Sequence, residues 1–169
     1  MIRMIAAVSA NGVIGKDNTI PWNYKEDMQF FRKTTSNKEF PPTVIMGKNT
    51  FISMGSRKLP GRRNIVITKS DLGGVVETYA ELWEAIELGL GNTTADIWLI
   101  GGTTIYKEGM KYAEEIYITE IPETIEGENL AYFPEIDKSK FTVKEYIPLF
   151  DAEGKQTLQV AKYVKIKEV

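Results

Sequence analysis

One carboxylate stands out in the sequence because its neighbours are large and apolar. Asp27 lies in the stretch 20–31, and on a helix it would share a face with Phe31, four residues further on. Phe30 and Phe31 cannot both face solvent without losing the free energy of aromatic burial. An acid in such surroundings carries a desolvation penalty. We therefore interpret Asp27 as a working group rather than an error of hydrophobic patterning.

The composition limits which other groups could assist this acid. The chain has no histidine and no cysteine, which excludes disulfides and thiolate catalysis and removes the commonest general base and metal ligand. Proton chemistry must then use Asp, Glu, Lys, Tyr or water, and no metal is expected. The formal net charge is -2, with both signs scattered, so neither nucleic acid nor an anionic membrane is an expected partner.

Length and hydropathy predict one domain over residues 1–169, because 169 residues with 43% hydrophobic and 26% charged side chains suffice for one core. The apolar start at 1–8 is too short, and too soon followed by polar residues, for a signal peptide. No apolar run approaches the length of a membrane span. We expect a soluble cytoplasmic protein, and a monomer because no exposed apolar stripe is evident.

The elements that would position Asp27 follow from the hydrophobic pattern. Continuous apolar runs predict buried strands of a parallel sheet at 4–8, 43–47, 65–68, 97–100 and 116–119. Alternating segments predict an antiparallel edge hairpin from 141–144 and 157–160. Helices are expected at about 24–35, from Lys48, after a capping box at Thr78–Glu81, and from Ile105. The predicted fold class is α/β: a single domain with a mostly parallel sheet of about eight strands, a C-terminal antiparallel hairpin and helices on both faces.

Two junctions between a strand and a helix have the composition of an anion site. At 47–50 and 101–104, glycine precedes polar residues, so the backbone could approach a phosphate and helix-start amides could bind it. Neither is a GxGxxG motif, and an ordinary tight turn explains each one alone. Together they favour an elongated phosphate-bearing ligand. Lys48 and Lys69 could hold an extra phosphate, as on a 2′-phosphorylated dinucleotide, although solvated surface lysines are equally expected.

Seven segments of the chain resemble dihydrofolate reductases, in that family's order and near its spacings. They are 13–18, 20–22 with Asp27, 44–51, 59–64, 100–102, 117–119 and 133–134. Each segment is unspecific alone, but seven in register are specific. The resemblance implies the family's fold and reaction, in which NADPH reduces 7,8-dihydrofolate to 5,6,7,8-tetrahydrofolate for one-carbon metabolism and thymidylate synthesis.

The resemblance also assigns substrate and catalytic residues. Asp27 matches the acid of the pterin pocket, Trp22 the residue that helps hold an ordered water, and Thr119 the hydroxyl that supports the acid. Arg62 matches the arginine that pairs with the α-carboxylate of the glutamate tail, where a planar fork suits bidentate binding; a surface arginine is the alternative. The apolar walls around the pterin and aminobenzoyl groups would be Ile5, Ala7, Met28, Phe31, Met54 and Ile100.

On the cofactor side the resemblance implies three groups of residues. The adenosine phosphates would lie against Gly47, Lys48, Asn49, Thr50, Thr68 and Lys69. The pyrophosphate turn would be Gly101, Gly102, Thr103, Thr104 and Ile105. The nicotinamide and its lid, whose closure excludes water, would involve Ala7, Ile14, Asn18, Ile20 and Tyr106.

The chemistry needs a hydride at carbon and a proton at nitrogen. The cofactor supplies the hydride, and the protein aligns the two rings and excludes water. Apolar packing should raise the pKa of Asp27, whereas hydrogen bonds to pterin nitrogens should lower it, and the sequence leaves this balance open. A water near Trp22 is the expected proton donor, rather than Asp27 itself.

Departures from the family pattern occur in four places, one of which is Lys58, before Leu59, where proline is commoner. Residues 39–42 look like an insertion, and the turn 101–104 lacks a third glycine and a following basic residue, which leaves the preference for NADPH over NADH to Lys48 and Lys69. The segment 126–133 is longer than usual, with Glu128 where Asp is common.

Two alternatives stay open. One is a reductase of the same architecture that acts on another heterocycle, such as a pyrimidine intermediate of riboflavin synthesis; Asp27 and Arg62 argue against it because they suit a pterin edge and a glutamate tail. The other is a non-catalytic nucleotide-binding module, which would bind the cofactor without oxidising it.

Overall fold

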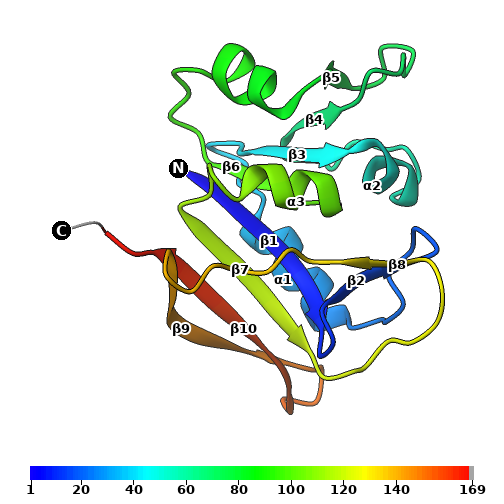
Figure 1. Ribbon diagram of the computed structural model, residues 1–169, viewed down its shortest axis with the longest axis vertical. Coiled ribbons are helices and arrows are strands. Elements are labelled where there is room, and N and C mark those ends of the chain that lie inside the picture. The colour runs from blue at the N-terminus through cyan, green and yellow to red at the C-terminus, as the bar shows by residue number, and fades with distance from the viewer. Residues whose placement is uncertain (168–169) are drawn as a thin grey trace.

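The computed structural model describes residues 1–167, and its framework is one eight-stranded sheet in the order β5-β4-β3-β6-β1-β7-β10-β9 (Figure 1). Its strands are β1 (Ile2–Ser9), β3 (Thr43–Gly47), β4 (Arg63–Ile67), β5 (Glu77–Tyr79), β6 (Ile97–Leu99), β7 (Glu115–Ile121), β9 (Phe141–Phe150) and β10 (Gln156–Lys165). The last two residues of the predicted domain lie outside the described range.

Strand direction follows the prediction. From β5 to β7 every neighbouring pair is parallel, and β10 and β9 add two antiparallel pairings at one edge. The apolar runs are continuous because the central strands are covered on both faces: β6 and all of β3 except its last residue are buried. The predicted α/β sheet with a C-terminal edge hairpin is confirmed.

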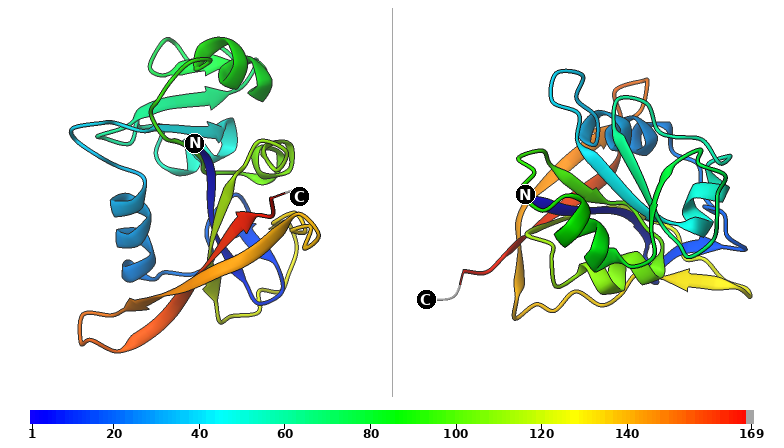
Figure 2. Two further views of the ribbon diagram at one scale, coloured as in Figure 1. Left: turned by 90° about the vertical axis from the view of Figure 1, so that its left-hand side faces the viewer. Right: turned by 90° about the horizontal axis from the view of Figure 1, so that it is seen from above.

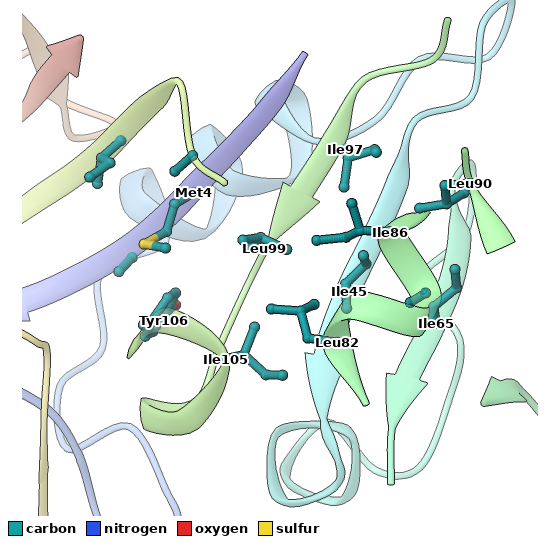
Figure 3. Packing of buried hydrophobic residues seen from close by; sticks show 14 of the residues in the cluster. Met4, Ile45, Ile65, Leu82, Ile86, Leu90, Ile97, Leu99, Ile105 and Tyr106 are labelled. Atoms are coloured by element: carbon teal, nitrogen blue, oxygen red, sulfur yellow. The ribbon is translucent and has the colours of Figure 1, made fainter. Parts of the chain in front are cut away.

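Helices pack on both faces of this sheet (Figure 2). One face carries α1 (Lys25–Thr34) and α2 (Lys48–Ser53), whose aromatic residues join a cluster that includes Ile5 and Ile100. The other carries α3 (Thr103–Gly109) and the π-helix η1 (Glu84–Gly89). Figure 3 shows Ile86 and Ile105 of these two helices gathered with Ile45 and Leu99 of the sheet. None of the described helices is long and apolar enough to cross a membrane.

The capping box predicted at Thr78–Glu81 is wrong. Thr78 lies in β5, where it pairs with Val66 of β4, and η1 begins without a side-chain cap. Pairing with β4 prevailed over the local tendency to cap a helix, because a β-branched residue beside a tyrosine, here Thr78 and Tyr79, favours a strand. The apolar spacing after it was informative, because Leu82, Ile86 and Leu90 are buried.

A second, two-stranded sheet was not anticipated. In it, β2 (Val13–Lys16) pairs antiparallel with β8 (Leu130–Tyr132). Both strands are short and β2 contains a glycine, so neither has a strand pattern of its own. Their pairing joins the segment after β1 to the long connection after β7, at the edge where the parallel strands end.

Candidate active site

Asp27 occupies the first turn of α1, on the face directed at the sheet. Its side chain is half-buried, and Thr119 of β7 lies against it. Burial raises the pKa of Asp27, a hydrogen bond from the Thr119 hydroxyl lowers it, and the nearby charge of Glu26 raises it again. The net effect is a pKa above the ordinary aspartate value, because desolvation of the carboxylate is the largest contribution.

Two strands, β1 and β7, and the helix α3 converge beside this acid. Thr119 is 1% exposed and stands opposite Ala7 in the pairing of β7 with β1. The buried hydroxyl of Tyr106, from α3, donates a hydrogen bond to the Ile5 carbonyl at 2.8 Å. Burial and the charge of Asp27 raise the pKa of Tyr106, so the acid and this phenol share one electrostatic environment.

The predicted apolar wall is largely assembled. Ile5 and Ile100 belong to the buried cluster under α1 and α2, and Phe31 and Met54 pack against it. Ala7 and Trp22 pack instead against the neighbouring cluster of Ile121, Leu149, Leu158 and Val160. Met28 is not brought into this wall, since 65% of it is exposed on α1.

Arg62 lies at the other end of α1. Its Nη1 donates to Thr35 Oγ1 at 3.1 Å, and its Nε donates to the Pro60 carbonyl at 2.9 Å. Burial, and then the charge of Arg32, lower the pKa of Arg62. Within residues 1–167 it forms no ion pair, whereas the adjacent Arg63 binds Glu77 through two hydrogen bonds of 2.9 and 2.7 Å. A half-buried arginine without an anion is a natural site for a ligand carboxylate.

The two glycine junctions are in direct contact. The Gly47 amide donates to the Gly101 carbonyl at 2.7 Å, and the peptide bond between Gly101 and Gly102 is cis. A Cβ added at Gly101, where φ is +116°, would lie 3.0 Å from the Tyr106 hydroxyl oxygen. One added at Gly102 would lie 3.6 Å from Thr50 Oγ1. Gly101 thus leaves room for the Tyr106 ring, while Gly47 and Gly102 present half-buried backbone without a side chain, which fits close approach by a pyrophosphate.

The polar residues at the end of β4 lie near this surface. Lys48 Nζ donates to Ser70 Oγ at 3.1 Å, and Thr68 Oγ1 accepts a hydrogen bond from the Ser70 amide at 3.0 Å. Lys69 extends away to an exposed contact with Glu81 at 3.7 Å. Ile105 is buried under Gly47. The remaining predicted cofactor residues of the junctions are on the surface, namely Asn49, Thr103 and Thr104.

The predicted lid residues divide into two groups. Ile14 packs against the cluster that contains Ile105 and Tyr106. Asn18 and Ile20 are exposed: Asn18 lies within a tight turn closed by two backbone hydrogen bonds between Lys16 and Thr19, and Ile20 follows it. Neither Asn18 nor Ile20 belongs to the buried clusters of the described residues.

Two features near the site were not found by sequence reasoning. The Tyr24 hydroxyl donates to Glu123 Oε2 at 2.7 Å, and the partners are too far apart in the chain for any local pattern to reveal them. A surface groove of about 670 Å³ lies at the ends of β1, β7 and β10, lined in part by Ser9, Glu120 and Thr157. None of its lining residues was predicted for the site.

Comparison with known proteins gives a consistent result. The family model described as dihydrofolate reductase matches residues 1–165. The chain is 37% identical to the dihydrofolate reductase of Bacillus subtilis (strain 168), over 83% of this chain and 80% of that protein. It is 40% identical to the dihydrofolate reductase of Neisseria gonorrhoeae, over 85% of each. A solved dihydrofolate reductase from Enterococcus faecalis, complexed with NADP(H) and RAB-propyl, superposes with a TM-score of 0.85 at 29% identity and covers 99% of this chain and 97% of that one.

The mostly parallel sheet, the lone acid and the paired glycine junctions define the class, which is an α/β oxidoreductase that uses a dinucleotide. Within that class the assignment is specific, because the family match spans nearly the whole chain. The chain belongs to the dihydrofolate reductase family.

Proposed function

We propose that the residues around Asp27, Arg62 and the glycine junctions form the active site for the family's reaction. That reaction is the NADPH-dependent reduction of 7,8-dihydrofolate to 5,6,7,8-tetrahydrofolate. The observation that carries this placement is the half-buried Asp27, whose pKa is raised and which Thr119 supports by a hydrogen bond. A charged group is kept in such surroundings when a ligand uses it.

On the substrate side, Asp27 binds the amidine-like edge of the pterin, and Thr119 orients the carboxylate. Ile5, Ala7, Phe31, Met54 and Ile100 enclose the pterin and aminobenzoyl groups, whereas Met28, 65% exposed on α1, could contact them only from the rim of the pocket. Arg62 binds the α-carboxylate of the glutamate tail, because it is half-buried and forms no ion pair within residues 1–167.

On the cofactor side, the backbone of Gly47, Gly101 and Gly102 faces the pyrophosphate, with Thr103, Thr104 and Ile105 in the turn. The adenosine phosphates would be held by Lys48, Asn49, Thr50, Thr68 and Lys69, and the nicotinamide by Ala7, Ile14, Asn18, Ile20 and Tyr106. Bound NADPH supplies the hydride. The contact between Gly47 and Gly101 supports this arrangement because it places both junctions at one point.

The protein itself binds and orients the substrate and controls the delivery of the proton. Trp22, packed beside Ala7 against one apolar cluster, helps hold a water that delivers the proton to the pterin nitrogen. Asp27 stabilises the protonated ring from its edge. The raised pKa of Asp27 means that the free enzyme keeps a proton on this group at a higher pH than an ordinary aspartate does.

The direct experiment follows the absorbance of the reduced nicotinamide with purified protein. Oxidation of NADPH that requires dihydrofolate and stops on addition of a folate-analogue inhibitor is the expected result. Oxidation with a pyrimidine intermediate of riboflavin synthesis, but not with dihydrofolate, would instead identify a reductase of another heterocycle. Binding of NADPH without oxidation by either substrate would identify a nucleotide-binding module.

The organisation of the protein is part of the same proposal. We expect one cooperative domain, a monomer and a cytoplasmic location. A single unfolding transition and light scattering at the mass of one chain test the first two, and subcellular fractionation tests the third.

A further inference from the structure

Residues 12–22, between β1 and α1, form a segment that we call the lid, and residues 123–129, after β7, form one that we call the strap. The strap holds the lid at several points. Lys16 Nζ donates to the Glu126 carbonyl at 3.0 Å, and Asn129 Nδ2 donates to Asp17 Oδ1 at 2.9 Å. These contacts hold the middle of the lid, and both involve exposed side chains.

Glu123, the first residue of the strap, contacts both ends of the lid. Its carbonyl accepts a hydrogen bond from the Ala10 amide at 2.8 Å, just before the lid. Its carboxylate accepts one from the Tyr24 hydroxyl at 2.7 Å, just after the lid. One residue next to β7 thus fixes the point where the chain leaves β1 and the point where it enters α1.

The contact with Tyr24 is partly buried. The tyrosine ring packs against the cluster of Ile121, Leu149, Leu158 and Val160. The hydrogen bond to Glu123, followed by burial, raises the pKa of Tyr24 to about 12. At the other end of the lid, the Asn11 side chain donates to the Ile125 carbonyl at 2.7 Å and accepts from the Ile125 amide at 3.0 Å. The hydrogen bond from Tyr24 to Glu123 is thus the side-chain link to the strap at the end where α1 begins.

Tyr24 is also the residue from which α1 starts. It is the N-cap of α1, with extended backbone and no side-chain cap, and its carbonyl accepts the Met28 amide at 3.2 Å. Asp27 lies in that first turn and meets Thr119 of β7, while Tyr24 meets Glu123 just beyond β7. The first turn of α1 therefore has two polar links to the same strand and its continuation.

From these contacts we propose that Tyr24 and Glu123 are positioning residues for the reduction, a role that rests on the proposed function of Asp27. Their hydrogen bond sets where α1 begins relative to β7, and so keeps Asp27 in register with Thr119. It also ties both hinges of the lid to one carboxylate. Neither residue touches the reacting atoms.

The test is a set of four variants. Tyr24→Phe removes the hydroxyl and keeps the ring, Glu123→Ala removes the acceptor, Glu123→Gln keeps an acceptor oxygen, and Tyr24→Phe/Glu123→Ala removes both. Loss of this partly buried hydrogen bond should lower kcat for dihydrofolate about tenfold. The double variant should be no slower than either single variant, because both remove the same contact, and Glu123→Gln should keep most of the turnover. The dissociation constant for NADPH should not change.

A matched control removes a hydroxyl that also donates to a glutamate. Tyr79 Oη donates to Glu77 Oε2 at 3.2 Å on β5, at the other end of the sheet, and Tyr79→Phe should leave kcat unchanged. An equal loss in Tyr24→Phe and Tyr79→Phe would overturn the proposal. So would additive losses from Tyr24→Phe and Glu123→Ala, or a loss of NADPH affinity as large as the loss of turnover.

A second readout does not depend on turnover. In the protein without ligands, hydrogen exchange of the Met28 amide should be faster in Tyr24→Phe than in wild type, and unchanged in Tyr79→Phe. Unchanged exchange in Tyr24→Phe would overturn the positioning role. If wild type failed to oxidise NADPH with dihydrofolate, the proposed function would fail, and the exchange measurement would still decide whether this hydrogen bond orders the first turn of α1.

Discussion

The substrate side and the cofactor side of the proposed site are built from different chemistry. On the substrate side, side chains carry the polar function: Asp27 has a raised pKa in apolar surroundings, and Arg62 is half-buried and forms no ion pair within residues 1–167. On the cofactor side, the closest contact joins backbone to backbone, from the Gly47 amide to the Gly101 carbonyl. On that side, glycine residues without a Cβ atom leave room for the cofactor to approach the backbone.

This difference predicts opposite sensitivities. Activity on the substrate side should be sensitive to pH and to the loss of a single functional group, because Asp27 and Arg62 are both partly desolvated in the protein without ligand. A site made of backbone should tolerate the loss of side chains but not the addition of one methyl group. The substitutions below test this contrast, from the largest expected effect to the smallest.

The largest effect is expected for Asp27→Asn. Turnover of dihydrofolate at neutral pH should fall by about a hundredfold or more, the scale of losing one electrostatic contact to charge that develops in the reaction, while affinity for NADPH is kept. Steady-state kinetics and a binding titration with the cofactor provide the measurement. Near-normal turnover would remove Asp27 from its assigned role.

The same variant should be more stable than wild type at neutral pH. Because the pKa of Asp27 is raised above its ordinary value of 3.8, the folded state binds this proton more tightly than the unfolded state does. The stability of the wild type therefore falls as pH rises from the ordinary aspartate range through the raised pKa. Denaturant unfolding at several pH values should show the variant's advantage at neutral pH. The advantage should vanish below the ordinary aspartate pKa, where the wild-type carboxyl is protonated and uncharged. A constant difference at all pH values would contradict this.

A single added methyl group should damage the cofactor side. In Gly101→Ala the Cβ would lie 3.0 Å from the Tyr106 hydroxyl oxygen at a φ of +116°, and such backbone strain costs about 1–3 kcal/mol. NADPH affinity and the free energy of unfolding should both fall. Gly154→Ala is the matched control, since its φ is +81° and nothing lies within 4 Å of the added Cβ. Equal loss of NADPH affinity in both variants would break the contrast between the two sides.

Two adjacent arginines sharpen the comparison on the substrate side. Arg62→Ala should raise KM for dihydrofolate about tenfold or more, the effect of losing hydrogen bonds to a charged group, and should affect a pterin without the glutamate tail far less. Arg63→Ala removes an arginine already bound to Glu77 and should leave both KM values near wild type. If Arg62→Ala raised KM equally for the two substrates, the tail-binding role would be excluded.

The smallest effect is expected for Lys48→Ala with Lys69→Ala. The pair should narrow the preference for NADPH over NADH by only a fewfold, because exposed ion pairs contribute little. Most of the change should come from Lys48, since Lys69 is 81% exposed and contacts Glu81. The ratio of kcat/KM for the two cofactors provides the measurement, and an unchanged ratio would place the extra phosphate elsewhere.

Much of the fold could be predicted because local pattern and tertiary burial agree. The run at 43–47 became β3 with those bounds, and the helix expected at about 24–35 became α1 with caps at Tyr24 and Thr35. The prediction failed where they disagree. Thr78 was predicted to cap a helix, but it pairs with Val66 in the sheet instead. The strands β2 and β8 were missed because each is a strand only by pairing with the other.

The site divides in the same way. Asp27 could be singled out because an acid among aromatic residues is a local anomaly. The contact of Gly47 with Gly101 follows from two strands that end at one edge. The pairing of Tyr24 with Glu123 could not be predicted, because their meeting depends on how α1 is placed against β7. The exposure of Met28 is likewise set by the direction of α1's side chains, and not by its apolar character.

The most direct test of a desolvated, functional acid is the titration of its carboxyl group by carbon NMR in the protein without ligands. The signal of Asp27 can be assigned by its loss in Asp27→Asn. We expect a pKa of Asp27 above 3.8 that changes when a folate analogue binds. A pKa at or below that value, unaffected by the ligand, would contradict it.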